Sequence, residues 1–421
     1  MFQEKYPGIP VLYADAGDFT GDPTVPGQRQ TDALIEAMNQ MGYKVAALGL
    51  RELTQGWDPF AARRAKAMFP FVSANIVWQD TALPVVDPFV IVSAPLRPGA
   101  KGKEIRIAFT GVTMNNPAFL KSGSSGRTIV TIDPIEAAAK VVPRMREKAD
   151  LVVVLASIDI EKCRALARRA KDVDLILGGL GAAQSRPDDF PEDSLIGKTR
   201  IQLVGDQGKN LGEVRLNFKD GRALGTVQRA VVGLTRDWPD QAELAALMTA
   251  TRESINDYNR AQAEAANPFA SQGGAAAPAT TPTATSKPTA ASPAAYTGSE
   301  RCRPCHEAAY ATWAKSSHAR AFQILVTNKQ DFNPRCVGCH VVGYGRPGGF
   351  LNAASSPRLV HVGCEACHGP SSAHPDTVGA GYGTTTTDAC RTCHTPENSP
   401  DFNPSTYIPK VRHWDEARAA R

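Results

Sequence analysis

The chain has 421 residues, of which 42% are hydrophobic and 21% are charged, and its formal net charge of +5 is small for this length. The length predicts two or three domains, and the composition is that of a globular protein. Because no basic block stands out, the sequence favours neither a nucleic-acid partner nor a membrane surface. No apolar run approaches the roughly 18 residues of a membrane span, so none is expected.

Residues 1–236 alternate short apolar segments with helical patterns, which is typical of an α/β domain. One helix start is well marked: Asp133 is a preferred N-cap, Pro134 suits the first helical position, and Glu136 completes a capping-box-like pair. Cys163 lies in a helical pattern with no histidine near it, which predicts a buried thiol rather than a nucleophile. The predicted strands cover residues 9–13, 71–76, 105–109 and 151–155.

Short segments of this region, in matching order and spacing, resemble the metallophosphoesterase domain of 5′-nucleotidases. The resemblance implies a four-layer α/β sandwich. In that family the first strand carries an Asp-x-His pair and precedes the segment matching residues 9–18; that strand is missing here, and the first five residues lack the apolar core of an export signal. We therefore expect the natural start to lie further upstream. The matching segments are residues 15–18 with Gly21, 47–52, 73–76, 109–113, 174–179 and 211–214.

The departures from the family concern its two metal ions, which Asp, Asn and several His residues hold and which activate water. Leu50 and Arg51 stand where the family has Asn-His, and residues 156–159 and 178–181 replace its other histidine motifs. Asp18 alone remains as a candidate ligand, and a carboxylate-only site could hold Mg²⁺. The dinuclear centre is therefore not expected to form. The prediction is a catalytically dead domain, without phosphoesterase activity, that serves docking or assembly.

Two connecting segments follow the α/β domain. Residues 237–264 repeat apolar side chains at helical spacing, which predicts a helix that packs on a neighbour. Residues 265–297 are rich in Ala, Pro, Thr and Ser, and such a segment cannot bury enough apolar surface to offset its ordering entropy. We expect it to be a mobile linker.

Residues 298–421 contain four Cys-x-x-Cys-His motifs, and no histidine precedes His306. In this spacing two thiols bind haem covalently and the adjacent imidazole becomes the proximal iron ligand. One match could be half of a zinc site, but four in one module predict a small, mostly irregular or α-helical cytochrome with four covalently attached haem c groups. The motif residues are Cys302, Cys305 and His306; Cys336, Cys339 and His340; Cys364, Cys367 and His368; and Cys390, Cys393 and His394.

The sixth iron ligands are expected among the four remaining histidines, because all seven methionines lie at or before Met248. His318, His374 and His413 are the predicted distal ligands, which gives mostly bis-histidine haems. His361 stands only three residues before Cys364, where the chain is already attached to another haem. Whether it is a ligand or a hydrogen-bonding neighbour therefore stays open.

The module resembles the tetrahaem cytochromes related to the electron acceptor of hydroxylamine oxidoreductase. The resemblance implies that one haem, here that of Cys336 and Cys339, can lack a distal protein ligand. The resemblance depends on Trp313 with residues 317–319, on Gly343 and Tyr344 after the second motif, on residues 363–370 with His374, and on residues 393–397 with His413.

The predicted protein is a periplasmic or otherwise extracytoplasmic electron-transfer protein, because haem c is normally attached outside the cytoplasmic membrane. Its expected partners are a redox protein donor and acceptor, and a homo-oligomer or a larger cytochrome assembly stays open. Two alternatives remain. One is a redox enzyme that acts on a small nitrogen or sulfur species at an open-coordinate haem of His340. The other is a phosphohydrolase with a redox accessory module.

Overall fold

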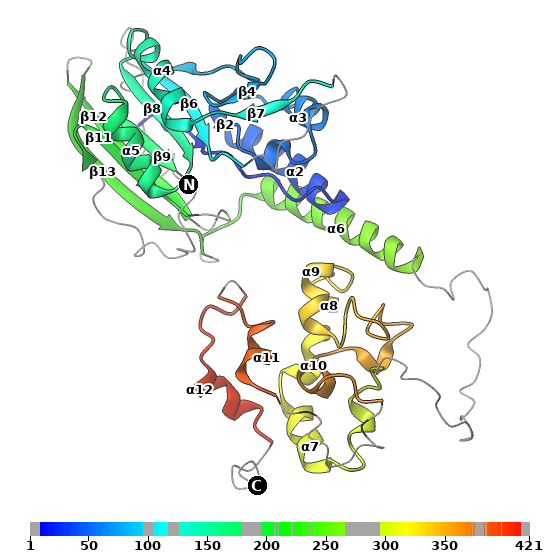
Figure 1. Cartoon of the computed structure of the whole chain (residues 1–421). Coiled ribbons are helices and arrows are strands. Elements are labelled where there is room, and N and C mark those ends of the chain that lie inside the picture. Colours follow the sequence, from blue (N-terminus) through cyan, green and yellow to red (C-terminus); the bar gives the residue numbers. More distant parts are fainter. Residues whose placement is uncertain are drawn as a thin grey trace. The chain divides into compact units, whose positions relative to one another are not determined.

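The computed structural model describes residues 9–95, 104–116, 126–178, 195–205, 208, 210–219, 222–235, 238–265, 295–372, 374, 383, 385–396 and 398–413. The chain divides into two compact units, Met1–Thr251 and Arg252–Arg421, and Figure 1 shows the elements of each. The predicted linker 265–297 lies almost wholly outside the described residues. Residues 179–181 also lie outside them; they belong to the segment 178–181, which stands where the family has a histidine motif.

Two sheets form the centre of the first unit. In the smaller sheet, β1 (Ala14–Asp15), β2 (Val45–Ala47) and β3 (Phe71–Val72) are all parallel. The larger sheet has the order β10-β11-β9-β8-β6-β5, parallel in its middle and antiparallel at both edges. Its strands are β5 Val90–Pro95, β6 Glu104–Thr113, β8 Leu151–Ser157, β9 Leu175–Gly178, β10 Leu195–Ile196 and β11 Thr199–Leu203; the pairs β4 Ile76–Trp78 with β7 Ile129–Thr131 and β12 Asn210–Lys219 with β13 Arg222–Gly233 complete the strands.

Three buried clusters give the order of the layers. Met38 of α2 packs with Leu48 and Phe71 on the outer face of the smaller sheet. Side chains of both sheets meet in a second cluster, which contains Ala47, Val72, Phe109 and Val153. At Gly111 the sheets approach so closely that a Cβ would lie 2.4 Å from the carbonyl oxygen of Val72.

The outer face of the larger sheet packs on the remaining helices. Val142 of α4 and Leu166 of α5 belong to a third cluster with Val152 and Val154. The order helix, sheet, sheet, helix confirms the predicted four-layer α/β sandwich (Figure 1). The helices are α2 Val25–Met41, α3 Trp57–Arg64, α4 Pro134–Arg146 and α5 Ile160–Arg169.

Several local predictions are confirmed and two are wrong in detail. Helix α4 begins at Pro134, and one carboxylate oxygen of Asp133 accepts hydrogen bonds from the amides of Ile135 and Glu136 at 2.9 and 2.8 Å. The predicted strands 105–109 and 151–155 lie within β6 and β8. Residues 9–13 are not a strand, since β1 begins at Ala14.

The predicted strand 71–76 is divided by a polar turn. The hydroxyl of Ser73 accepts from the amide of Ile76, and the Asn75 amide group donates to the carbonyls of Thr113 and Ile132. Hydrogen bonding of these side chains outweighs the apolar pattern, so the chain changes sheet between β3 and β4.

Cys163 is fully buried in α5, and burial raises the pKa of its thiol to about 12. The thiol is therefore not activated at neutral pH, which confirms the prediction of an inert buried cysteine.

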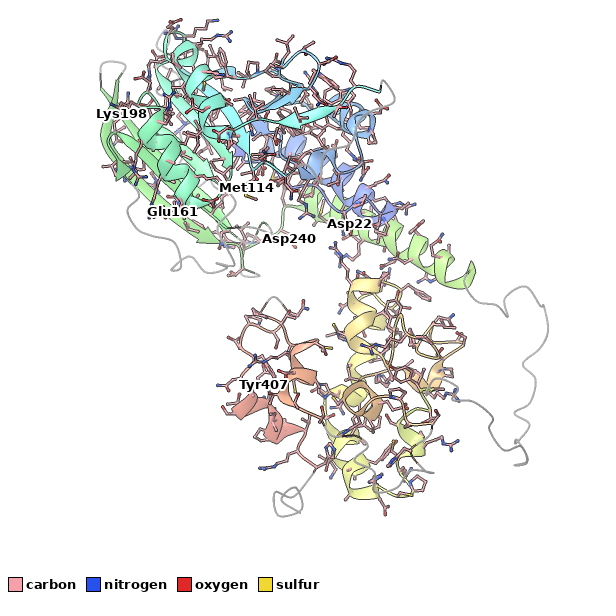
Figure 2. The ribbon with its side chains drawn as sticks, in the orientation of Figure 1. Asp22, Met114, Glu161, Lys198, Asp240 and Tyr407 are labelled. Carbon is pink, nitrogen blue, oxygen red and sulfur yellow. The ribbon has the colours of Figure 1, made fainter. Side chains whose placement is uncertain are left out.

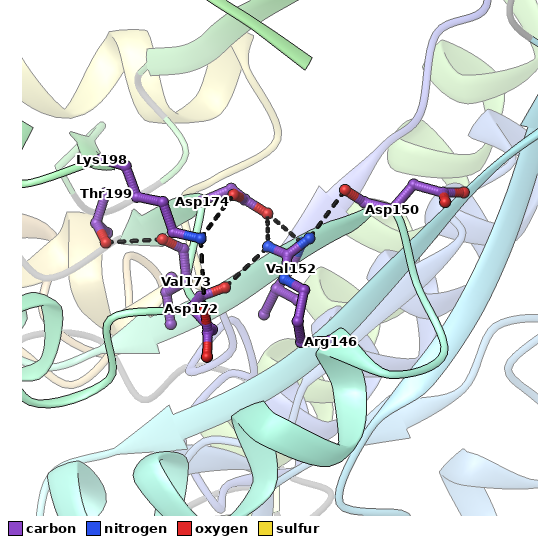
Figure 3. A network of polar contacts seen from close by, with 8 residues as sticks. All are labelled: Arg146, Asp150, Val152, Asp172, Val173, Asp174, Lys198 and Thr199. Atoms are coloured by element: carbon purple, nitrogen blue, oxygen red, sulfur yellow. Dashed lines mark hydrogen bonds and ion pairs between the residues drawn. The ribbon is translucent and has the colours of Figure 1, made fainter. Parts of the chain in front are cut away.

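An ion-pair network ties α4 to the amino ends of β8 and β9 (Figure 3). The Arg146 guanidinium pairs with the Asp174 carboxylate and donates to the carbonyls of Asp150 and Asp172 at 3.0 and 2.9 Å. The same carboxylate accepts from the amide of Val152 at 2.8 Å. This end of the sheet is therefore closed by structural contacts, which leaves the carboxyl ends of the strands for a site.

The second unit is built from short helices around one small cluster of buried side chains. Phe322, Leu325, Val337 and Leu359 belong to it. Within its described residues the only strand-like pairing is the bridge between Val341 and Val360. The helices are α7 Glu307–Lys315, α8 Ala321–Thr327, α9 Pro334–His340, α10 Cys364–His368, α11 Thr387–Arg391 and α12 Pro404–Tyr407.

Helix α6, Ala242–Ala265, crosses the boundary between the two units and occupies the range of the predicted packing helix. Over the described parts of the chain, no helix is both long and apolar enough to cross a membrane.

Candidate functional sites

Each Cys-x-x-Cys-His motif forms a helical turn. The second and third motifs lie in α9 and α10. In the first and fourth, the amides of His306 and His394 donate to the carbonyls of Cys302 and Cys390, both at 2.9 Å. One helical turn brings positions i, i+3 and i+4 to the same side, so each motif presents two thiols and one imidazole together.

Three of the four motif histidines face a histidine from outside the motifs. The ring centroids of His306 and His374 are 6.1 Å apart, and those of His318 and His394 are also 6.1 Å apart. For His368 and His413 the separation is 5.8 Å. The structure thus brings His374, His318 and His413, the three predicted distal ligands, each opposite a motif histidine.

These separations fit an iron atom between the rings. An imidazole nitrogen lies about 2 Å from a first-row metal ion, so two imidazoles on opposite sides of one metal have centroids about 6 Å apart. Ordinary aromatic contacts cover a broader range, roughly 4.5 to 7 Å. The pairing of one motif ring with one other ring in all three cases is what axial ligation of haem requires.

Hydrogen bonds of the Nδ1 atoms leave the Nε2 atoms available. Nδ1 of His340 donates to the carbonyl of Ala321 at 2.6 Å, and Nδ1 of His413 donates to that of Val411 at 2.8 Å. His368 has the same kind of contact with Gly383, and His394 contacts the Ser399 hydroxyl at 3.1 Å. Such contacts fix the tautomer and orientation of a metal-binding imidazole.

Aromatic side chains hold the ring of His394 from two further directions. Phe402 is stacked on it at 4.6 Å, and Tyr407, labelled in Figure 2, contacts it edge-on at 5.6 Å. The fourth motif is therefore fixed by α12 and the segment before it.

His340 and His361 are arranged differently. Nδ1 of His361 accepts a hydrogen bond from the amide of Phe322 at 3.2 Å, whereas His340 bonds the carbonyl of Ala321. The carbonyl and amide belong to one peptide group, whose C=O and N–H point in opposite directions. Within the described ranges, no ring pair joins His340 to another histidine.

Thiols of different motifs lie close to one another. The thiols of Cys302 and Cys364 interact, and this interaction raises the pKa of Cys302 and lowers that of Cys364 to about 6. Burial is the largest cause of the raised pKa of Cys339, and the charge of Cys393 adds to it. The charge of Cys390 acts on Cys367, although burial is the larger cause of the raised pKa of Cys367. The first motif is thus next to the third, the third to the fourth, and the fourth to the second.

In the first unit, polar side chains gather at the carboxyl ends of the strands. Asp15 ends β1, Glu52 follows β2, and Ser157 ends β8. Asp18, whose φ of 60° is left-handed, contacts the Ser157 hydroxyl through one oxygen and accepts from the amide of Arg51 at 2.8 Å through the other. Ligands of α/β proteins bind at this edge of a sheet.

Backbone amides occupy the Glu52 carboxylate. Its two oxygens accept from the amides of Asp18, Thr20 and Gly49 at 3.0, 3.2 and 2.8 Å. Burial, followed by repulsion from Asp18, raises the pKa of Glu52 to about 8, and burial raises that of Asp15 to about 6. Among the described residues, no group of three or more His, Cys, Asp or Glu is arranged to hold a metal ion.

Sequence reasoning retained only Asp18 at this edge and missed the contribution of Glu52. The resemblance could have pointed to Glu52, because residues 47–52 match the family and end in Glu52.

Comparisons with known proteins agree with the two units. Residues 301–369 match the family "Cytochrome c554 and c-prime". Cytochrome c-554 of Nitrosomonas europaea is 37% identical over 103 residues, which are 21% of this chain and 44% of that protein. The chain is a cytochrome c554-like module joined to a phosphoesterase-like domain. The cytochrome module therefore binds haem c covalently and is multihaem.

The likeness of the first unit is to phosphoesterases. The 2′,3′-cyclic-nucleotide 2′-phosphodiesterase/3′-nucleotidase of Yersinia enterocolitica is 35% identical over 128 residues, 29% of this chain and 19% of that protein. The calcineurin-like phosphoesterase YfkN of Bacillus subtilis shares the fold, with a TM-score of 0.50 and 22% identity over 61% of this chain and 86% of that one. The chain thus spans less than half the length of these two curated relatives.

This likeness corrects one prediction. The sequence favoured an electron carrier over an enzyme without deciding between them, and the missing histidines suggested that phosphoesterase activity is not to be expected. That prediction is wrong, because 128 residues of the chain are 35% identical to a phosphodiesterase, and the strand-end carboxylates Asp15 and Asp18 are present. Loss of histidines removes one set of metal ligands, and it does not by itself exclude hydrolysis.

Proposed function

We propose that the cytochrome module holds four haem c groups and passes electrons between redox proteins. Each motif supplies two thiols for thioether bonds and one proximal imidazole. His374, His318 and His413 would be the distal ligands of the haems of His306, His394 and His368. Haem iron accepts and releases single electrons, and two imidazole ligands leave it no open position for substrate.

The three histidine pairs carry this proposal, since each places a second imidazole opposite a motif histidine. Electrostatic interactions between thiols also relate the first motif to the third, the third to the fourth and the fourth to the second. Groups attached at neighbouring thiols lie near one another, so the module offers a continuous path for electrons. The ends of that path are the first and second motifs, where we expect the donor and the acceptor to dock.

The haem of His340 supports a second candidate function. Because Nδ1 of His361 accepts a hydrogen bond, the neutral ring carries its proton on Nε2. His361 would then be a hydrogen-bonding neighbour and not a ligand. An iron with His340 as its only protein ligand could bind a small nitrogen or sulfur species, and the module would then act as a redox enzyme.

Phosphate-ester hydrolysis by the first unit is another candidate. It is supported by the likeness to the Yersinia enterocolitica phosphodiesterase and by Asp15 and Asp18 at the carboxyl ends of the strands. Within the given residues before His306, the carboxylates Asp15 and Asp18 are the groups that such a reaction could use. The full chain should be assayed with 2′,3′-cyclic nucleotides and Mg²⁺ or Mn²⁺, and turnover that Asp18→Ala abolishes would establish it.

Attachment of haem c supports an extracytoplasmic location, and a docking or assembly role of the first unit also remains our prediction. The test of the main proposal is the intact mass of protein matured in a host with the c-type attachment system. Four added haems and reversible reduction of all four are expected. Three or fewer haems in fully matured protein would contradict it.

A further inference from the structure

Glu365 lies between the two cysteines of the third motif and is buried. Only 3% of its surface is exposed, and among the described residues of the second unit it is the only buried acidic or basic side chain. A buried carboxylate is costly unless it is fully hydrogen-bonded. Its partners therefore show what it holds in place.

All partners of Glu365 are donors. One carboxylate oxygen accepts from the amide of Gly298 at 2.7 Å, and the other accepts from the amide and hydroxyl of Ser371 at 2.8 and 2.6 Å. The amide of Thr297 lies 3.0 Å from both oxygens. Three backbone amides and one hydroxyl thus face the two carboxylate oxygens, and a side-chain amide in the same place would turn its own N–H toward a backbone donor.

The donors come from two segments that sequence alone does not connect. Thr297 and Gly298 lie just before the first motif, and Ser371 follows the third. Next to them, the hydroxyl of Ser299 accepts from the amide of Cys364 at 3.1 Å. There is no spare room in this contact, since a Cβ on Gly363 would lie 2.5 Å from that hydroxyl.

The carbonyl of Ser299 accepts from the amide of Cys302 at 3.0 Å, so one residue holds the first cysteine of both motifs. The chain leading into the first motif is thus fixed to the third motif through Glu365, at the place where their haem attachment points meet. We infer that Glu365 is a positioning residue that sets the distance and angle between the haems of the first and third motifs. This inference depends on the proposed haem-to-haem electron path and specifies what fixes its first step.

Electron transfer and excitonic coupling between two haems both weaken steeply with separation. The experiment therefore uses the mature full chain and its Soret circular dichroism, in which coupled haems give a two-signed couplet. Glu365→Gln keeps the shape of the side chain but turns an amide group toward backbone donors. Its couplet should lose the contribution of the haems of the first and third motifs, while four haems and the absorption spectrum of the unaltered protein are retained.

Two further variants make the result decisive. Ser371→Ala removes one of the four donors and should weaken the couplet by less. Glu307→Gln makes the same chemical change at an exposed side chain one residue after the first motif, and it should leave the couplet unchanged. If Glu365→Gln does not mature, Ser371→Ala alone decides.

The proposal is overturned if Glu365→Gln and Ser371→Ala keep the full couplet, if Glu307→Gln weakens it equally, or if the unaltered four-haem protein shows none. A protein with fewer than four haems would instead contradict the proposed function, which haem counting distinguishes from failure of the positioning role.

Discussion

The two units differ in what fills their interiors. The first has three clusters of buried side chains, which join four layers of helix and sheet. The second has one cluster, around Phe322 and Val337, for a segment more than half as long. A small apolar core rarely stabilises a fold alone, so the second unit must obtain much of its stability from its cofactors. The sequence of the second unit is therefore constrained by haem ligation, and that of the first unit by side-chain packing.

The largest expected effect follows from withholding haem. When the full chain is produced without the c-type attachment system, the second unit should remain unfolded, because cofactor binding supplies its folding free energy. The first unit should fold as before. Limited proteolysis followed by mass spectrometry would show resistant fragments from within residues 1–251 only. A resistant haem-free second unit would remove the contrast between the units.

A cavity made in the first unit should lower the stability of that unit and leave the haem module unchanged. Leu166 is fully buried between α5 and the larger sheet. Leu166→Ala should lower the free energy of unfolding of this unit by about 2 to 5 kcal/mol, measured by denaturant titration. The haem absorption should not change. Leu351→Ala, at a side chain that is 55% exposed in the second unit, is the matched control and should have little effect on either.

Single ligand changes should affect one iron each. His318→Ala removes the ring opposite His394 and should create one additional high-spin haem in the ferric protein. In contrast, one high-spin haem should already be present before mutation, and His361→Ala should leave its spin state almost unaltered. Electron paramagnetic resonance measures both. Four low-spin haems, one of which becomes high-spin in His361→Ala, would make His361 a ligand.

The smallest expected effect is a pH dependence confined to the first unit. The pKa of Glu52 is raised to about 8 and that of Asp15 to about 6, above the values of 4.5 and 3.8 for the free side chains. The folded state therefore binds more protons, and its stability falls as the pH rises from about 4 to 8. Denaturant unfolding at several pH values should show this slope, and Glu52→Gln should reduce it. A stability that rises over this range would contradict the raised values.

How much could be predicted from the sequence also differs between the two units. The Cys-x-x-Cys-His motifs were evident because covalent attachment requires a fixed local spacing. The pairing of His318 with His394 could not be deduced, since it joins residues far apart in the chain through tertiary structure. In the first unit, α4 was found from its N-cap, whereas the turn at Ser73 and Asn75 was missed because side-chain hydrogen bonds overrode an apolar pattern.

Glu365 shows a further limit. Between two cysteines it looks like an exposed charge, and only its four donors reveal a buried role. The error about enzymatic activity has a related cause: absent histidines are easily seen, whereas strand-end carboxylates such as Asp15 and Glu52 gain meaning only when the strands are assembled.

The contact between Cys302 and Cys364 bears on the order in which the protein matures. In an oxidising compartment, two adjacent thiols form a disulfide readily. A chain that folded before its haems were attached would therefore risk cross-linking its first motif to its third. During maturation these thiols must stay reduced and apart until each has formed its thioether. The first and third motifs should therefore come together only in the last step of assembly.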